Sequence, residues 1–316
     1  MSGQIVTFVG KRGEDLRCAD LKHAHIHGVD LTNVDLSRAD MTFAHVGESV
    51  APGAKFNNIN AQGAEFINTN LYIASFVGAE LERARFVACS IVHTEFNGAR
   101  LAEAELLKCG IANAIFRNAD LSGAKLRAVD CLGVHFENAK LVNATFNAVD
   151  CTFACFENAK LVNAVFTNAC LKQAVMTGAD ARRLHGERVD MHALNADGVN
   201  LHGASLKGAY LVEARLAGAD LTGADLAGAD LTKADLRGAN LRNANLVGAN
   251  LTDANLTDAC LDGADLRHTG INIQRRRRGA HRHGGHREHR ERRHDGRRER
   301  QHGVLMATLL RADAPP

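Results

Sequence analysis

Apolar or small residues recur at every fifth position over most of the chain, from Leu16 to Ile271, without a change of frame. We call this position i. A second series of smaller residues lies two positions earlier and runs from Ala19 to Ala264. Neither a helix with 3.6 residues per turn nor a strand with a period of two keeps both series on one side at this spacing. The chain is therefore expected to turn a corner in each group of five residues.

The sequence also repeats at 20 residues, which indicates a square coil with four groups per turn. The nonapeptide FENAKLVNA occurs at 136–144 and again at 156–164. Ten of the thirteen Phe residues occupy position i, and all ten lie in every second group of five residues. This places them on two opposite sides of the square. At the strand spacing of roughly 4.8 Å, Phe56, Phe76 and Phe96 are predicted to stack as a ladder in the core.

The groups of five, written A(D/N)LxG or A(D/N)LxN as in ADLTGADLAGADLTK from Ala219, resemble the pentapeptide repeat family over about residues 14–271. The resemblance implies an all-β fold, a right-handed quadrilateral β-helix. In such a solenoid, positions i and i−2 fill the interior, and positions i−1, i+1 and i+2 face water. About 13 coils at ~4.8 Å each make a rod of roughly 60 Å.

We divide the chain into an N-terminal cap (1–13), a β-solenoid (14–273), a disordered Arg/His-rich tail (274–303) and a short apolar C-terminal segment (304–316). Two stretches of the solenoid depart from the repeat pattern. Within 46–54, Pro52 cannot donate a ladder hydrogen bond, so a bulge is expected. Within 181–199, position i shrinks while position i−2 grows, which predicts either a repacked coil or a bend.

The tail differs chemically from the rest of the chain. It holds twelve Arg, six His and four acidic residues, and it begins with Arg275, Arg276, Arg277 and Arg278. Such a segment is too polar to bury a core. Three interpretations stay open: an arm for nucleic acid or an anionic membrane surface, a weak metal-binding tract, or an extension without function. Its His residues lack paired Cys ligands, and we expect no metal and no cofactor in this protein.

No catalytic motif is found in the sequence. It contains no Walker loop, no dinucleotide-binding fingerprint and no HExxH, and a filled square rod offers flat faces rather than a pocket. An enzyme is therefore not expected. The eight Cys follow the repeat and are interpreted as small buried hydrophobic residues in a reducing cytoplasm. Because there is no signal peptide and no apolar run of about 20 residues, we expect a cytoplasmic protein without a transmembrane segment.

The functional surface is then expected to be one side of the rod. In the 20-residue register one side carries seven acidic residues, opposed by Lys172 and Lys233. These candidate partner-binding residues are Asp30, Asp130, Asp150, Asp190, Glu213, Asp230 and Asp253. Duplex DNA of the same length, about 60 Å, would carry roughly 35 phosphates. This side is therefore acidic, but much less densely charged than DNA.

Two functions stay open. The best-known bacterial members of the family that the chain resembles bind DNA gyrase or topoisomerase IV by imitating DNA, which gives resistance to quinolones or to self-produced toxins. The resemblance thus implies a noncatalytic protein that binds a macromolecular partner through flat faces, with this DNA mimicry as the most concrete version. The alternative is a structural scaffold whose basic tail tethers it to nucleic acid or an anionic membrane, without a topoisomerase role. The resemblance also implies a homodimer through the C-terminal end.

Overall fold

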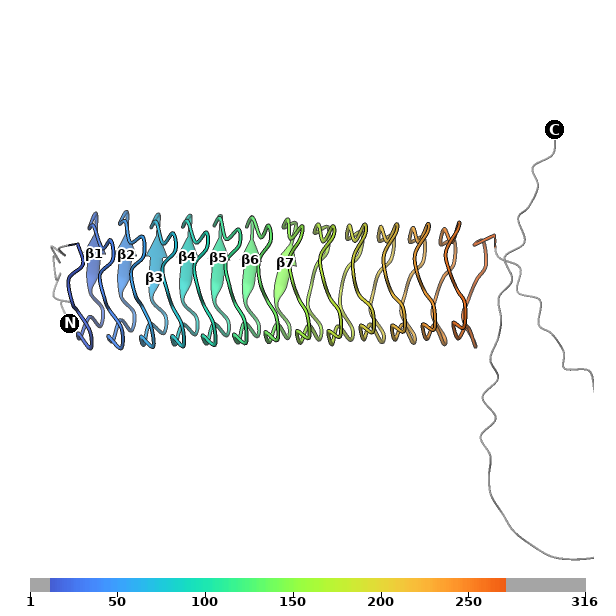
Figure 1. Ribbon diagram of the computed structural model, residues 1–316, viewed down its shortest axis with the longest axis horizontal. Coiled ribbons are helices and arrows are strands. Elements are labelled where there is room, and N and C mark those ends of the chain that lie inside the picture. Colours follow the sequence, from blue (N-terminus) through green and yellow to red (C-terminus); the bar gives the residue numbers. More distant parts are fainter. Residues whose placement is uncertain (1–11, 271–316) are drawn as a thin grey trace, which may run out of the picture.

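The computed structural model describes residues 12–270, which form a straight rod of stacked turns (Figure 1). Each turn takes 20 residues, because every ladder partner lies 20 positions further along the chain and runs parallel. Four such ladders follow one another around the rod, and their first pairs are Asp15–Asp35, Asp20–Asp40, His25–His45 and Asp30–Val50. The predicted quadrilateral β-solenoid is therefore confirmed. The predicted N-terminal cap up to residue 11, the tail with its four leading Arg, and the apolar C-terminal segment lie outside the described residues.

One ladder is regular enough to form a parallel seven-stranded sheet in chain order. Its strands are β1 (His25–His27), β2 (His45–Gly47), β3 (Glu65–Ile67), β4 (Arg85–Val87), β5 (Glu105–Leu107), β6 (Lys125–Arg127) and β7 (Thr145–Asn147). We call the side that carries them the strand side. The others are named after the first residue of their ladder: the Asp15 side, the Asp20 side and the Asp30 side. On these three sides, neighbouring turns pair through single bridges.

The backbone at each corner explains the composition of the repeat. The carbonyl of Leu36 accepts a bond from the Ala39 N–H at 2.9 Å, which closes a four-residue turn. The third residue of this turn, Arg38, has a φ of 63°. This is the type II geometry, which favours Gly or Asn at the third residue, and it places them at position i+2 of the repeat.

The Asp or Asn at position i−1 completes the hydrogen bonding of the corner. The N–H groups of Leu36 and Arg38 donate to the next turn, but that of Ser37, at i+1, does not. Instead, the Ser37 N–H donates to the Asp35 carboxylate at 3.0 Å. An acidic residue at i−1 therefore has a structural role that an Asn fulfils equally well.

The core contains the Phe ladder that the sequence predicts. The rings of Phe56 and Phe76 stack with centroids 4.5 Å apart, and Phe76 stacks on Phe96 at 4.9 Å. From the opposite side, the Phe66 ring meets Phe56 edge-on at 6.1 Å. All four rings are fully buried. Stacked and edge-to-face pairs are the arrangements that aromatic rings prefer, so the ladder stabilises the rod beyond its buried area.

The bulge predicted at 46–54 is wrong. The Ala51 N–H still donates to the Asn70 carbonyl at 2.7 Å, and the Gly53 N–H to the Tyr72 carbonyl at 3.1 Å. Pro52 occupies position i+1, whose N–H takes no part in the ladder. A proline is therefore tolerated there without any change of register.

The stretch 181–199 is a repacked coil rather than a bend. The Ala181 N–H donates to the Asn200 carbonyl at 2.8 Å as elsewhere in the rod. Leu184 and Leu194, the enlarged i−2 residues, are buried beside the shrunken i positions. The rod passes straight through this region (Figure 1). Core volume is thus kept by exchanging large and small residues within a turn.

Candidate functional site

The seven acidic residues predicted as a partner-binding set all lie on the Asp30 side. Five belong to its ladder at position i−1, where Asp130 pairs directly with Asp150. The other two, Glu213 and Asp253, occupy position i+2 and have positive φ values. The register assigned from the sequence is therefore correct, and the structure aligns these carboxylates along one side of the rod.

Their charge is partly cancelled by cations on the same side. Arg12 lies 2.6 Å from the Asp30 carboxylate, Lys172 lies 3.1 Å from Asp190, and Lys233 lies 3.4 Å from Glu213. Within residues 12–270, no cationic side chain forms an ion pair with the remaining four, which are Asp130, Asp150, Asp230 and Asp253. Sequence reasoning left out Arg12 because this residue precedes the first recognisable repeat.

Hydrogen bonds favour the ionised form of two of these carboxylates. The Thr32 hydroxyl, followed by the Arg12 guanidinium, lowers the pKa of Asp30 to about 2. The Thr152 hydroxyl donates to Asp150 at 2.6 Å and lowers the pKa of that carboxyl below its usual value. Both groups are therefore negatively charged at neutral pH.

The same side carries large hydrophobic residues that the sequence analysis missed. Of the seven such residues that are strongly exposed in the described part of the chain, six lie on the Asp30 side, and five of these fall between residues 50 and 153. We call these five the apolar strip: Val50, Tyr72, Ile73, Leu132 and Phe153. No Asp, Glu, Lys or Arg occupies this side between Asp30 and Asp130. Scanning outward positions for hydrophobicity as well as charge would have revealed the strip.

Two members of the strip have a backbone conformation that is unfavourable for residues of their type. Ile73 has a φ of 51° and Phe153 a φ of 61°, at the corner position where Gly and Asn are the commonest residues. A β-branched residue is rare at such angles, which cost an L-residue roughly 1–2 kcal/mol. Their side chains are 52% and 57% exposed, so core packing does not account for them.

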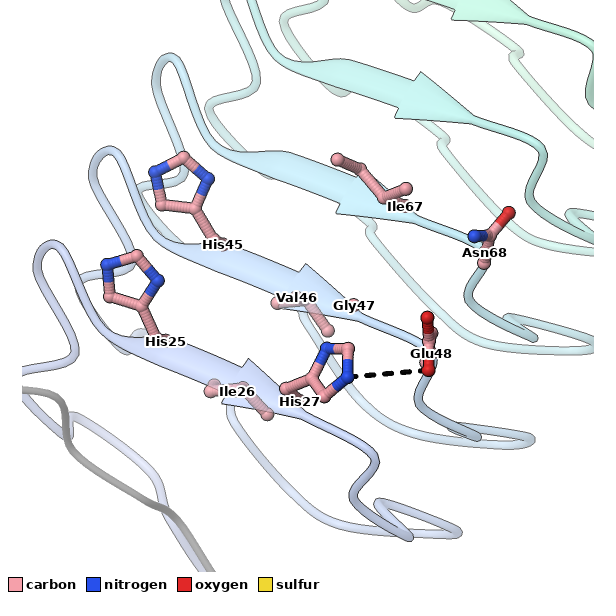
Figure 2. Close-up of a pocket in the computed structure, with 9 residues that line it drawn as sticks. All are labelled: His25, Ile26, His27, His45, Val46, Gly47, Glu48, Ile67 and Asn68. Carbon is pink, nitrogen blue, oxygen red and sulfur yellow. Dashed lines mark ion pairs between the residues drawn. The ribbon is translucent and has the colours of Figure 1, made fainter.

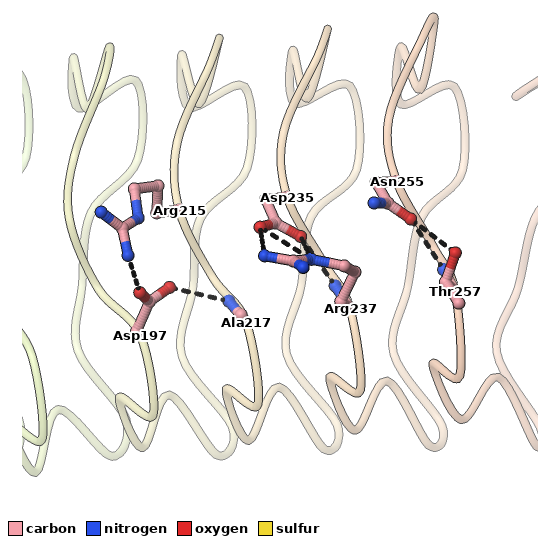
Figure 3. Close-up of polar contacts among 7 residues, drawn as sticks. All are labelled: Asp197, Arg215, Ala217, Asp235, Arg237, Asn255 and Thr257. Atoms are coloured by element: carbon pink, nitrogen blue, oxygen red, sulfur yellow. Dashed lines mark hydrogen bonds and ion pairs between the residues drawn. The ribbon is translucent and has the colours of Figure 1, made fainter.

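Several acidic residues on the other sides also form ion pairs. On the Asp15 side, Arg215 bonds to Asp197, and Arg237 forms a forked pair with Asp235 at 2.6 Å (Figure 3). One turn further on, the uncharged pair Asn255 and Thr257 takes the same place (Figure 3). On the strand side, Glu65 pairs with Arg85, and Glu105 pairs with Lys125 at 2.9 Å. Neither of these two sides therefore presents a continuous row of unpaired carboxylates.

A shallow cavity of about 230 Å³ lies near the N-terminal end of the strand side. Gly47 contributes no side chain there, and His27 leans over it toward Glu48, 3.4 Å away (Figure 2). The rings of His25 and His45, which also line the cavity, stack with centroids 4.9 Å apart. In the described region, no three His, Cys, Asp or Glu side chains are grouped so that they could hold a metal ion. Across the same residues, no helix has the length and apolar character needed to cross a membrane.

Comparisons with known proteins find several similar solved structures. A chain from the cyanobacterium Nostoc sp. strain PCC 7120, HetL, described as a pentapeptide repeat protein involved in heterocyst differentiation regulation, is 30% identical. Its alignment covers 80% of this chain and 93% of HetL, with a TM-score of 0.26. QnrB1, described as a plasmid-mediated fluoroquinolone resistance protein, is 18% identical over 69% of this chain and 87% of its own, with a TM-score of 0.31. A thylakoid lumen protein of Arabidopsis thaliana is 32% identical over 36% of this chain and 65% of its own, with a TM-score of 0.18. The comparison with curated proteins finds no match.

The family assignment follows from the repeat itself. The family model named Pentapeptide repeats matches the chain repeatedly, over residues 15–49, 53–86, 111–143, 127–161, 144–183, 200–238 and 234–269. These matches span most of the rod. The chain belongs to the pentapeptide repeat family.

Proposed function

We propose that the protein is a noncatalytic binding protein that holds a macromolecular partner, itself a protein, against the Asp30 side of the rod. The observation that supports this proposal is the apolar strip, which gathers on one side nearly all the large exposed hydrophobic residues. The strip consists of two groups on the same side, Val50 with Tyr72 and Ile73, and Leu132 with Phe153. Single exposed hydrophobic residues are common, but several gathered on one side are typical of an interaction surface. The uncharged part between Asp30 and Asp130 extends over five turns, roughly 24 Å.

The backbone geometry supports the same proposal. Ile73 and Phe153 occupy corner positions where Asn is the less strained choice. A bulky hydrophobic residue retained at a costly position, and still exposed, fits a role in binding better than a role in folding.

DNA gyrase or topoisomerase IV is the specific partner that we propose to test first. The unpaired carboxylates Asp130, Asp150, Asp230 and Asp253 favour it, because they leave negative charge along the side that borders the strip. Binding there by DNA mimicry would place the protein in the cytoplasm and protect the topoisomerase from quinolones or a self-produced toxin.

The experiment compares three variants in a gyrase supercoiling assay and in direct gyrase binding. The strip variant carries Ile73→Asn and Phe153→Asn, which suit the backbone and remove one large hydrophobic side chain from each end of the apolar strip. The charge variant replaces the four unpaired Asp by Asn, which keeps the corner hydrogen bonds. The control is Phe43→Asn on the Asp20 side, at an equivalent corner with a φ of 54° and 53% exposure.

Gyrase mimicry predicts that the wild type and the control inhibit supercoiling, while the charge variant does not. No inhibition by the wild type at tens of micromolar, together with unchanged quinolone susceptibility on expression, rules out the topoisomerase role. The broader proposal is then tested by affinity capture from a cell lysate. It requires a protein that the wild type and Phe43→Asn retain and the strip variant loses, and it fails if all three retain the same proteins.

A further inference from the structure

The Asp30 side changes character along the rod. From the C-terminal end back toward the apolar strip, its outward positions carry acidic residues with only Lys172 and Lys233 in opposition. The acidic residues met in that order are Asp253, Asp230, Glu213, Asp190 and Asp150; the exposed Tyr210 lies between Glu213 and Asp190, and Asp130 lies beside Leu132 within the strip. The strip then begins at Phe153 and Leu132, which are 57% and 41% exposed. A ligand suited to this path is basic first and apolar afterwards.

The part of this chain beyond the rod has the same order. Residues 274–303 contain twelve Arg against four acidic residues, and the apolar sequence VLMATLL follows at 304–310. The positive charge of residues 274–303 is complementary to the acidic part of the Asp30 side. The apolar residues 304–310 come at the point where this path reaches the apolar strip. Gly270, the last described residue, comes one 20-residue turn after Asn250, the last residue of the Asp30 ladder, and therefore stands at the register of this side.

The connecting length fits the distance. Gly270 and Asp150 are six turns apart, which is roughly 29 Å at the spacing of parallel strands. The 33 residues from 271 to 303, treated as a flexible chain, have a root-mean-square end-to-end distance of roughly 30 Å. The apolar segment therefore reaches Phe153 without being stretched. Tethering gives it an effective concentration of about a millimolar, so a weak contact is sufficient for occupancy.

We infer that residues 304–310 dock in cis on the apolar strip at Leu132 and Phe153, while the Arg-rich residues 274–303 lie along the acidic part of the Asp30 side. Where the proposed function holds, this contact regulates it, because the tail then covers the surface that the partner needs. The docking itself requires no partner and is measured without one. Its electrostatic part weakens as salt rises.

The chain has no Trp, so one substituted Trp reports on one site. Phe153→Trp places this reporter at the docking site in the full-length protein. Phe43→Trp is the matched control, at an equivalent corner on the Asp20 side. Each is measured with the natural tail and with Leu305→Asp and Leu309→Asp together. Neither of these two residues is among the described residues 12–270 that form the core of the rod.

Docking predicts that the fluorescence maximum of Phe153→Trp shifts to longer wavelength when the tail carries the two Asp residues, and in high salt with the natural tail. The Phe43→Trp maximum is expected to stay unchanged. Equal maxima for Phe153→Trp with both tails would overturn the inference. A shift that disappears on dilution would also overturn it, because a tail supplied by a second copy would then cover the strip.

The regulatory consequence is tested separately. If the tail covers the strip for nine-tenths of the time, the two tail substitutions tighten partner binding about tenfold. A fluorescence shift without any partner would leave the docking intact and contradict only the proposed function. If a partner is found whose binding needs the strip, but the Phe153→Trp fluorescence does not shift when the tail is substituted, only the docking is contradicted.

Discussion

At the scale of single residues, the acidic residues of the repeat first have a structural role, because they accept hydrogen bonds within the corner whether or not they bind a partner. Asp150 accepts hydrogen bonds from the Thr152 N–H at 2.9 Å and from its hydroxyl at 2.6 Å. Asn250 accepts the equivalent bonds from Thr252 at 3.1 Å and 2.7 Å. An Asp at position i−1 is therefore weak evidence for a function that needs charge. Asp-to-Asn exchange separates the two roles.

We predict that Asp150→Ala lowers the free energy of unfolding by about 1 kcal/mol, because the Thr152 N–H loses its acceptor. Asp150→Asn keeps an acceptor in place and is expected to change it by less than about 0.5 kcal/mol. Urea unfolding of the three proteins at neutral pH measures both effects. Equal losses in the two variants would show that the charge, and not the corner bond, stabilises the rod.

The pH dependence of stability gives a second prediction at Asp150. Its hydrogen bond with Thr152 lowers the pKa of the folded-state carboxyl, whereas the unfolded value is about 3.9. The stabilisation is therefore complete above about pH 4 and is lost as the pH falls through the folded-state pKa. Comparing urea midpoints between pH 5 and pH 2, we expect the wild type to lose stability relative to Asp150→Asn. A constant difference over this range would contradict the assignment.

At the scale of the corner, the backbone bonding makes neighbouring positions differ in their tolerance of proline. The Asn113 N–H donates to the Leu132 carbonyl at 2.9 Å, and Asn113 has a φ of 55°, which proline cannot adopt. Ala112, at i+1, occupies the position where Pro52 is accommodated. We predict that Ala112→Pro is neutral or stabilises by up to about 1 kcal/mol, while Asn113→Pro costs about 2 kcal/mol or more. Thermal unfolding of both variants tests the contrast, and similar losses in the two would refute it.

The Phe ladder gives a prediction for the core. Phe116 lies between Phe96 at 4.7 Å and Phe136 at 5.2 Å, and it is fully buried. Phe116→Ala is expected to lower the free energy of unfolding by about 3–5 kcal/mol, because a cavity remains and two ring contacts are lost. The exposed Phe153→Ala serves as the control, with an expected loss below about 0.5 kcal/mol. Denaturant unfolding distinguishes the two, and a small loss at Phe116 would mean that neighbouring turns collapse into the space.

The sequence predicts the interior of this fold far better than its surface. Position i and the 20-residue register suffice to place Phe56 above Phe76, because core packing repeats in every turn. Pro52 was misread because sequence alone does not tell which N–H groups the ladder uses. The apolar strip was missed for another reason: Tyr72 and Phe153 are 81 positions apart, and their common exposure appears only when outward positions are aligned by turn.

At the scale of the whole molecule, the two ends of the rod determine how it assembles. Among residues 12–270, the last ladder bonds run from Leu246 to Asp265 and from Gly248 to Arg267. Leu266 is only partly buried in the final turn, and Leu16 is its counterpart in the first. A terminal turn presents strand edges and apolar core to its surroundings unless another segment or another copy covers them.

We predict that full-length protein forms a dimer through its C-terminal end, since stacking two final turns covers both edges at once. Leu266→Asp places a charge in that contact and is expected to yield monomers. Leu16→Asp makes the same change at the other end and should leave the dimer intact. Light scattering over a range of protein concentrations measures the mass of each variant. A wild type of monomer mass at every concentration excludes this dimer, and dissociation by Leu16→Asp instead of Leu266→Asp would assign the contact to the N-terminal end.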